Sequence, residues 1–194
     1  MRRIGLMGGT FDPIHVGHLA IAVEARHALG LDEVVFVPAG RPWQKRAVAP
    51  AEDRYEMVCL AVAGTPGFAA SRIEIDRDGP TYTVDTLRAL RAEDPGAELW
   101  LLLGADALAG LDTWHEPDEV ARLAKVAVAA RPGGEPHTDV GGVAVTVLDL
   151  EPMEISSRDI RARLGRGDSV RGLVTPEVEA YIRAHGLYSA GAAA

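Results

Sequence analysis

The chain has 194 residues, of which 47% are hydrophobic and 25% are charged, and this composition is typical of one globular domain. Its length allows a sizeable buried core without metal or disulfide cross-links, and its single cysteine, Cys59, excludes an internal disulfide. A formal net charge of −8 argues against nucleic-acid partners and anionic membrane surfaces, because binding to either needs clustered Lys and Arg.

The apolar runs are short compared with segments that enter membranes. The longest, MVCLAVA, has seven residues, whereas a membrane span needs about 20. The first residues, MRRIGLMGG, reach glycine after a few apolar positions, which is too short for the apolar region of a signal peptide. We therefore expect a cytoplasmic protein with no membrane partner.

Strand-like and helix-like patterns alternate through the first half of the chain. Short apolar runs predict strands, and apolar residues three and four apart predict helices. The predicted strands are 2–8, 32–40 and the extended segment 68–75. The predicted helices are 16–31 and 50–64.

The same alternation continues in the second half. Strands are predicted at 97–106, 125–133 and 142–150. Helices are predicted at 81–94, 117–124, 156–167 and 175–188. The last of these has Thr175 as N-cap and Pro176 at its first helical position.

This alternation predicts an α/β fold, with a Rossmann-like, doubly wound and mostly parallel sheet and a small C-terminal helical portion. A single domain is expected over residues 1–189, and residues 190–194 are expected to be a disordered tail. Ligands of such sheets bind at the carboxyl ends of the strands. The loop after the first strand is therefore a candidate ligand-binding segment.

That loop contains two histidines three residues apart, His15 and His18, within GGTFDPIHVGH. If a helix begins here, the pair lies on one face near its amino end, a position that favours anions. Pro13 suits a first helical turn, because it needs no donor there. Neither the dinucleotide pattern G-x-G-x-x-G nor the Walker A pattern occurs in this segment.

Two other interpretations of the histidine pair stay open on spacing alone, a metal site and a purely structural role. The zinc-protease pattern H-E-x-x-H needs a glutamate between the histidines, and none is present. We therefore predict no metal site built by the protein.

The spacing G-x-F-x-P-x-H-x-G-H resembles the signature of the HxGH nucleotidylyltransferases, and ISSRDIR at 155–161 resembles their second signature. Over nearly its whole length the chain is most similar to the bacterial nicotinate-nucleotide adenylyltransferases, through TYTVDTL, GADAL, TW, RPG and AYIRAHGLY. The resemblance implies one nucleotidylyltransferase domain over residues 1–189. It also implies adenylyl transfer from ATP to nicotinate mononucleotide, with Mg²⁺ bound together with ATP.

The resemblance assigns triphosphate-binding roles to both signatures. The implied ATP-binding residues are Gly8, Gly9, Thr10, Phe11, His15, Gly17, His18, Ile155, Ser156, Ser157 and Arg161. The implied catalytic residues are His15, His18, Lys45 and Arg161. These types suit the chemistry, because a helix amino end and an Arg fork hold phosphates and nucleotidyl transfer needs positioning and charge stabilisation. Asp12 is either a helix cap or part of the site.

The resemblance also implies an acceptor pocket. Its residues are Lys45, Thr81, Thr83, Asp106, Trp114 and Arg131. Threonine hydroxyls can donate to the nicotinate carboxylate, and a tryptophan face can stack on the pyridine ring. Lys45 would lie over the acceptor phosphate, and Arg131 near that phosphate or the ATP ribose.

Two positions vary from the commonest family pattern. Arg158 stands where the family usually has threonine, and it would either contact phosphate or point to solvent. Trp43 stands where many members have histidine.

The rival interpretations concern the acceptor and catalysis itself. Nicotinamide mononucleotide, phosphopantetheine or glycerol phosphate are alternative acceptors within the same superfamily. A non-catalytic nucleotide sensor is an alternative from another class, but such a protein would be expected to lack His15, His18 or Arg161. A homo-oligomer is compatible with the sequence, which does not determine the oligomeric state.

Overall fold

A mostly parallel β-sheet forms the centre of the computed structural model, which describes residues 1–42, 47–129, 139–140, 143–151 and 153–189. The described strands are β1 (Arg3–Gly9), β2 (Glu33–Pro38), β3 (Phe68–Ala70), β4 (Glu98–Gly104), β5 (Lys125–Ala129), β6 (Asp139–Val140) and β7 (Val143–Leu148). Their order is β3-β2-β1-β4-β5-β7-β6, and only the β6–β7 pair is antiparallel. The prediction of a mostly parallel sheet is confirmed.

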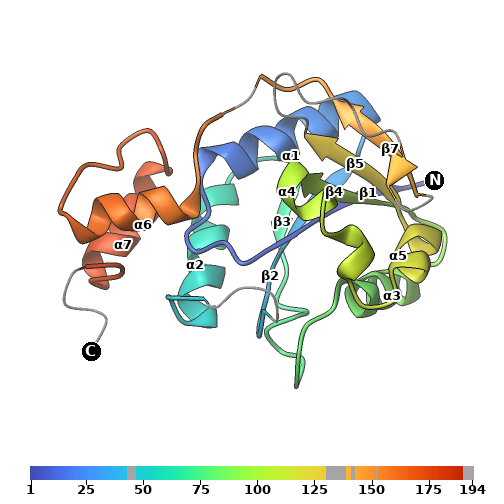
Figure 1. Cartoon of the computed structure of the whole chain (residues 1–194), viewed down its shortest axis with the longest axis horizontal. Helices are drawn as coiled ribbons and strands as arrows, with labels where there is room; N and C mark the ends of the chain where they lie inside the picture. Colours follow the sequence, from blue (N-terminus) through green and yellow to red (C-terminus); the bar gives the residue numbers. More distant parts are fainter. Residues whose placement is uncertain (43–46, 130–138, 141–142, 152, 190–194) are drawn as a thin grey trace.

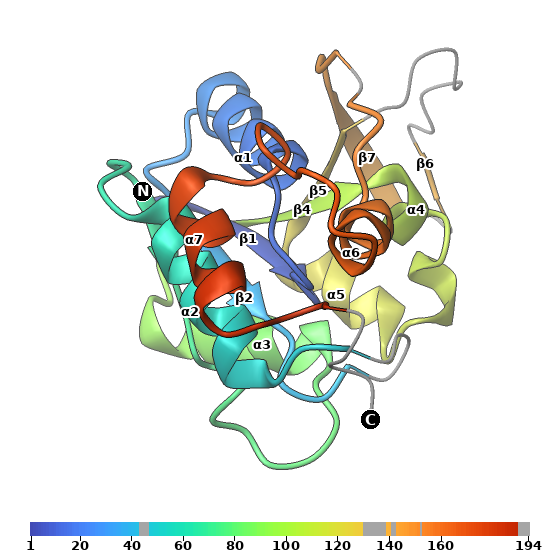
Figure 2. The ribbon, with the colours of Figure 1, turned by 90° about the vertical axis from the view of Figure 1, so that its left-hand side faces the viewer.

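Helices cover both faces of this sheet (Figures 1 and 2). The described helices are α1 (Val16–Leu29), α2 (Ala51–Val62), α3 (Thr83–Glu93), α4 (Ala105–Leu108), the 3-10 turn η1 (Leu111–Thr113), α5 (Pro117–Leu123), α6 (Ser157–Gly165) and α7 (Pro176–Ala184). In Figure 1, α6 and α7 extend beyond α2 at one side of the molecule. The doubly wound arrangement and the small C-terminal helical portion are confirmed.

The core consists of two clusters, one on each face of the sheet. The first contains residues of α1, α2, α6 and α7, and the second contains residues of α3 and α5. Strand β4 contributes to both, because its middle residues are buried on both sides. Trp100 in this strand is 9% exposed, as expected for a core tryptophan.

Local signals account for the starts of the last two helices. The Ser156 hydroxyl accepts a hydrogen bond from the Asp159 N–H at 3.1 Å and caps α6. The Thr175 hydroxyl accepts from the Val178 N–H, and Pro176 is the first residue of α7. The predicted cap at Thr175 is confirmed.

Two local predictions were wrong. Helix α1 begins at Val16, so Pro13 lies in the turn before it rather than in its first turn. Phe11, two residues before Pro13, has a buried ring and a left-handed φ of 49°, so the chain is not in a right-handed helix there. The segment 68–75 is extended only to Ala70, because the N–H groups of Ile75 and Asp76 both donate to the Arg72 carbonyl and close a turn.

Candidate active site

The candidate site lies where the order of the strands reverses. Strands β1 and β4 are neighbours, and the chain leaves their carboxyl ends toward helices on opposite faces of the sheet. The turn after Gly9 leads to α1, and the segment after Gly104 contains α4 and η1. Such a switch point is the usual ligand site of a doubly wound sheet.

The two histidines lie at the start of α1, in a segment that we call the histidine turn (residues 9–18). His15 is the N-cap residue, and His18 lies in the first turn. Their rings are stacked with centroids 3.7 Å apart. The His15 N–H donates to Nδ1 of His18 at 3.2 Å, so the neutral His18 ring carries its proton on Nε2.

Burial keeps His15 neutral. His15 is only 8% exposed, and this desolvation lowers the pKa of its imidazole to about 4. Its Nδ1 atom is buried and has no hydrogen-bond partner among the described residues. A buried imidazole nitrogen without a partner is costly, and a ligand that bonded to it would remove that cost.

Two glycines of the histidine turn give space to neighbouring rings. A Cβ atom on Gly17 would lie 3.1 Å from Nδ1 of His15, and one on Gly9 would lie 3.1 Å from Cζ of Phe11. The Phe11 ring in turn meets the His18 ring edge-on at 5.1 Å. A Cβ atom on Gly8 would have no described atom within 4 Å. The proposed close approach of a ligand to Gly8 stays a prediction.

The second signature lies directly against the histidine turn. The Ser157 hydroxyl at the start of α6 donates to the Pro13 carbonyl at 2.9 Å. The Arg161 guanidinium donates to the Asp12 carbonyl at 2.6 Å, and Ile155 packs against the first core cluster. Two signatures more than 140 residues apart in the sequence therefore form one surface.

Asp12 is a buried anchor of this turn, a role that the sequence does not reveal. Its carboxylate accepts hydrogen bonds from the N–H groups of Val48 (2.7 Å) and Ala49 (3.1 Å) and from the Tyr188 hydroxyl (2.7 Å). It does not cap α1, because His15 is the N-cap there. Burial, together with the neighbouring Asp12, raises the pKa of Tyr188.

A buried arginine, Arg54, supports the same turn, and the sequence does not reveal this role either. Arg54 is 1% exposed and donates to the carbonyls of Thr10 (2.7 Å), Ala49 (3.2 Å) and Gly40 (3.4 Å). Desolvation lowers its pKa. The one signal in the sequence is a charged residue on the face of α2 that also carries Met57 and Val58.

The predicted acceptor threonines lie at the start of α3. Thr83 is the first residue of the helix, and Thr81 lies just before it. Thr81 is 6% exposed, and its hydroxyl donates to the Arg41 carbonyl at 3.4 Å. Beside it, buried Glu74 accepts from the Thr86 hydroxyl at 2.7 Å, and desolvation raises the pKa of Glu74.

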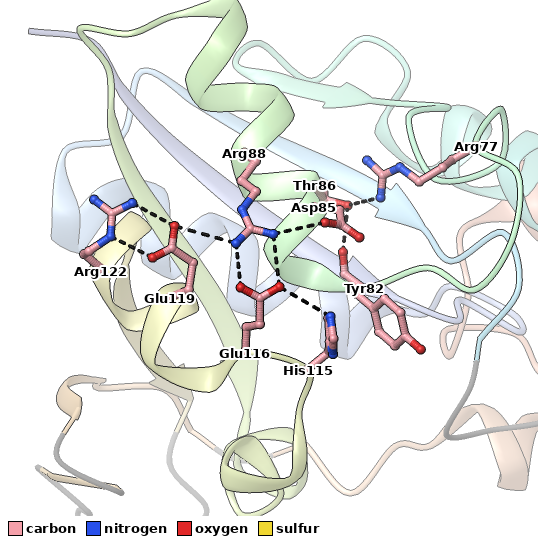
Figure 3. Close-up of polar contacts among 9 residues, drawn as sticks. All are labelled: Arg77, Tyr82, Asp85, Thr86, Arg88, His115, Glu116, Glu119 and Arg122. Atoms are coloured by element: carbon pink, nitrogen blue, oxygen red, sulfur yellow. Dashed lines mark hydrogen bonds and ion pairs between the residues drawn. The ribbon is translucent and has the colours of Figure 1, made fainter.

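The remaining described acceptor residues lie after β4. Asp106 is exposed in the first turn of α4, and half-buried Trp114 follows η1 and packs against the second core cluster. The next residue, His115, places its ring 4.4 Å from the ring of Tyr82, the N-cap of α3 (Figure 3). The start of α3 is therefore in contact with the segment that carries Trp114 (residues 111–116), which we call the Trp114 segment.

Some predicted positions lie outside the described residues, namely Trp43, Lys45, Arg131 and the segment 190–194. Arg158 is described and exposed in the first turn of α6. Within the described ranges, no group of three or more His, Cys, Asp or Glu is arranged to hold a metal ion. No helix in those ranges is both long and apolar enough to cross a membrane.

Comparison with known proteins agrees with this geometry. Residues 6–163 match the model of the Cytidylyltransferase-like family, and the chain belongs to that family. It is 50% identical to the probable nicotinate-nucleotide adenylyltransferase of Leifsonia xyli subsp. xyli, over 96% of this chain and 94% of the relative. It is 52% identical to the protein of the same name from Streptomyces coelicolor, over 94% of this chain and 98% of the relative. These two relatives, each about half identical to the chain, are both named probable nicotinate-nucleotide adenylyltransferase.

Solved structures share the fold. Plasmodium falciparum nicotinic acid mononucleotide adenylyltransferase complexed with NaAD superposes with a TM-score of 0.80 at 17% identity, covering 97% of this chain and 98% of that chain. A putative nicotinate-nucleotide adenylyltransferase from Vibrio parahaemolyticus gives a TM-score of 0.73 at 19% identity, covering 97% and 96%. At these identities the likeness establishes the architecture alone.

Proposed function

We propose that the protein transfers the adenylyl group of ATP to nicotinate mononucleotide, forming nicotinate adenine dinucleotide and releasing pyrophosphate. The observation that carries this proposal is the joining of the two signatures. The histidine pair, the amino end of α6 and Arg161 all lie around one turn at the switch point of the sheet. The names of the relatives that are about half identical over nearly their full length support the same reaction.

The reaction is an in-line displacement. A phosphate oxygen of the mononucleotide attacks the α-phosphorus of ATP, the bond between that phosphorus and the bridging oxygen breaks, and the electron pair leaves with pyrophosphate. No covalent enzyme intermediate is needed, because positioning and charge stabilisation supply most of the catalysis in such transfers.

His18 is proposed to stabilise the transferred phosphate. Its Nδ1 is already an acceptor for the His15 N–H, so Nε2 is the ring atom that can donate to a phosphate oxygen. His15, stacked on it, would use its buried Nδ1 or its other nitrogen toward the triphosphate. A nearby phosphate would raise the pKa of His15 from about 4, because the anion favours the imidazolium.

The other phosphates are assigned to the second signature. The amino end of α6, where the helix dipole is positive, suits the β and γ phosphates, and Arg161 adds positive charge beside it. Gly8, Gly9, Thr10 and Phe11 are proposed to offer backbone groups to ATP. Gly17 keeps the space that the His15 ring occupies.

The acceptor is proposed to lie between the start of α3 and the Trp114 segment. Trp114 would stack on the pyridine ring, and Thr83 and Asp106 would contact the mononucleotide. The hydroxyl of buried Thr81 has a backbone partner at Arg41, which favours a supporting role for it over direct contact. Lys45 and Arg131 remain proposed acceptor residues outside the described ranges.

Magnesium is proposed to arrive with ATP. In this proposal the ion is held mainly by phosphate oxygens of ATP and by water. When bound, the ion supplies charge neutralisation on the triphosphate.

We propose ATP and nicotinate mononucleotide as the partners, with no nucleic acid or membrane, in the cytoplasm. The test is pyrophosphate release by the pure protein from ATP and magnesium, with nicotinate mononucleotide, nicotinamide mononucleotide and phosphopantetheine offered separately. A strong preference for the first supports the proposal. Release with another acceptor would keep the chemistry and change the pocket assignment, whereas ATP binding without release would favour a nucleotide sensor.

A further inference from the structure

A network of exposed charges joins the start of α3 to the segment that carries Trp114 (Figure 3). Arg88 on α3 donates to both carboxylate oxygens of Glu116, from Nη1 to Oε1 at 3.2 Å and from Nη2 to Oε2 at 2.6 Å. Two parallel hydrogen bonds fix the orientation of the carboxylate relative to the guanidinium as well as the distance between them. Asp85, one turn before Arg88, accepts a further bond at 3.4 Å.

Glu116 has an unusual backbone conformation for its residue type. Its φ of 51° and ψ of 59° are left-handed, a region that glycine adopts readily and glutamate rarely. Glu116 is also the N-cap of α5, and its carbonyl accepts from the N–H groups of Glu119 and Val120. A residue held in such a conformation needs surrounding contacts that maintain it.

Glu116 lies two residues after Trp114. Trp114 ends η1, His115 follows it, and Glu116 turns the chain into α5. The carboxylate of Glu116 also lies 3.4 Å from Nε2 of His115, whose ring faces Tyr82. The turn is therefore attached to α3 at two places, through Arg88 and through Tyr82.

Both attachments belong to the helix whose first residue is Thr83. Helix α3 thus carries one side of the proposed acceptor pocket and also holds the turn that carries the other side. The hydrogen bonds within the ion pair raise the pKa of Arg88 and lower the pKa of Glu116, so both groups are charged at neutral pH.

We propose that Arg88 is a positioning residue for the acceptor nucleotide: by holding Glu116, it sets the distance between Trp114 and the start of α3. This inference rests on the proposed function, since it assumes that Trp114 contacts the pyridine ring. Arg88 itself does not touch the nucleotide in this proposal. Its loss should weaken acceptor binding without altering the triphosphate site around the histidines.

The test compares steady-state kinetics of the full-length protein and its Arg88→Ala variant. The expected result is a KM for nicotinate mononucleotide raised about three- to tenfold, the effect of losing a network of exposed ion pairs, with kcat and the KM for ATP unchanged within about twofold. Arg183→Ala is the matched control, because exposed Arg183 pairs with Glu179 at 2.5 Å within α7 and has no described contact with α3 or Glu116. It should leave all three constants unchanged.

A double-mutant cycle tests the route through Glu116. Glu116→Gln should raise the same KM, and the double variant Arg88→Ala, Glu116→Gln should be little worse than either single variant, because both remove one interaction. Arg88→Lys should give an intermediate KM, since lysine keeps the charge but loses the two-point contact. Additive effects, equal loss for ATP and acceptor, or an unchanged acceptor KM in Arg88→Ala would each overturn the inference.

The two proposals fail differently. If the unmodified protein releases no pyrophosphate with nicotinate mononucleotide, the proposed function fails. If it does so normally and Arg88→Ala keeps the same acceptor KM, the positioning role alone fails. Thermal unfolding of each variant checks that the fold survives, as expected for a residue whose side chain is 43% exposed.

Discussion

The hydroxyl of Tyr188 donates a 2.7 Å hydrogen bond to the carboxylate of Asp12, across 176 residues of sequence. Both residues are buried, and Asp12 occupies the turn that leads to the two histidines. The carboxylate has only two other described donors within hydrogen-bond distance, the N–H groups of Val48 and Ala49. One end of the chain therefore helps to hold the candidate active site at the other.

Removing that hydroxyl should cost stability. Tyr188→Phe leaves a buried carboxylate oxygen with one partner fewer, and we expect a loss of about 1–3 kcal/mol in the free energy of unfolding. The measurement is urea unfolding at pH 7. Tyr181→Phe is the matched control. The Tyr181 hydroxyl donates a 2.9 Å hydrogen bond to Asp53, which is not part of the histidine turn, and Tyr181 is more exposed than Tyr188. The interpretation is wrong if the two variants lose equal stability.

Removing the His18 ring should impair catalysis without unfolding the protein. His18→Ala deletes the proposed charge stabilisation of the transferred phosphate, and we expect turnover to fall at least about a hundredfold. Pyrophosphate release at saturating substrates measures this. His27→Ala, an exposed histidine near the other end of α1, should leave turnover unchanged. Near-normal turnover in His18→Ala would remove His18 from the mechanism.

Shortening Trp114 should affect the acceptor more than ATP. If its ring stacks on the pyridine, Trp114→Ala raises the KM for nicotinate mononucleotide, and ATP binding survives. Titration calorimetry with each nucleotide separates the two effects. Trp100 offers no useful control for this change, because it is part of the core. An equal loss of affinity for both nucleotides would make Trp114 a residue of the fold.

The neutral His15 makes stability depend on pH. Its pKa is lowered by burial to about 4, whereas an unfolded histidine titrates near pH 6.5, so the unfolded chain takes up this proton first as the pH falls. Above about pH 6.5, where the ring is neutral in both states, protonation of His15 does not reduce the free energy of unfolding. That free energy falls progressively toward pH 4, by about 3 kcal/mol at most.

Urea unfolding at several pH values between 7 and 4 checks this prediction. His15→Gln carries no titrating ring and should lose less stability than the unmodified protein over the same interval. The comparison between the two proteins is needed because carboxylates titrate at the lower end of the range. Parallel stability curves would show that His15 does not cause the difference.

The layout of the sheet could be predicted from sequence because it rests on local patterns. Strand β4 is a continuous apolar run, and Thr175 with Pro176 marks a helix start; both signals act within a few residues. The turn before α1 was harder to predict, because it contains a left-handed φ at Phe11, whose buried ring packs against the distant Phe36.

Candidate residues of the site could be named from the sequence where they form a linear signature, and the structure brings the two signatures into contact. His15, His18, Ser157 and Arg161 could be named in advance because each signature is contiguous. The supporting residues could not, since Arg54 and Tyr188 bond to the histidine turn across 44 and 176 residues of sequence. The pairing of Arg88 with Glu116 was likewise invisible, because it depends on where α3 meets α5.

The bonds from Ser157, Arg161 and Tyr188 to the histidine turn bear on the order in which the protein is made. Synthesis runs from the amino end, so the histidine turn leaves the ribosome long before its supports. The parallel sheet can assemble meanwhile from β1 to β5. A nascent or truncated chain without Ser157, Arg161 and Tyr188 would therefore hold His15 and His18 without the groups that bond to their turn.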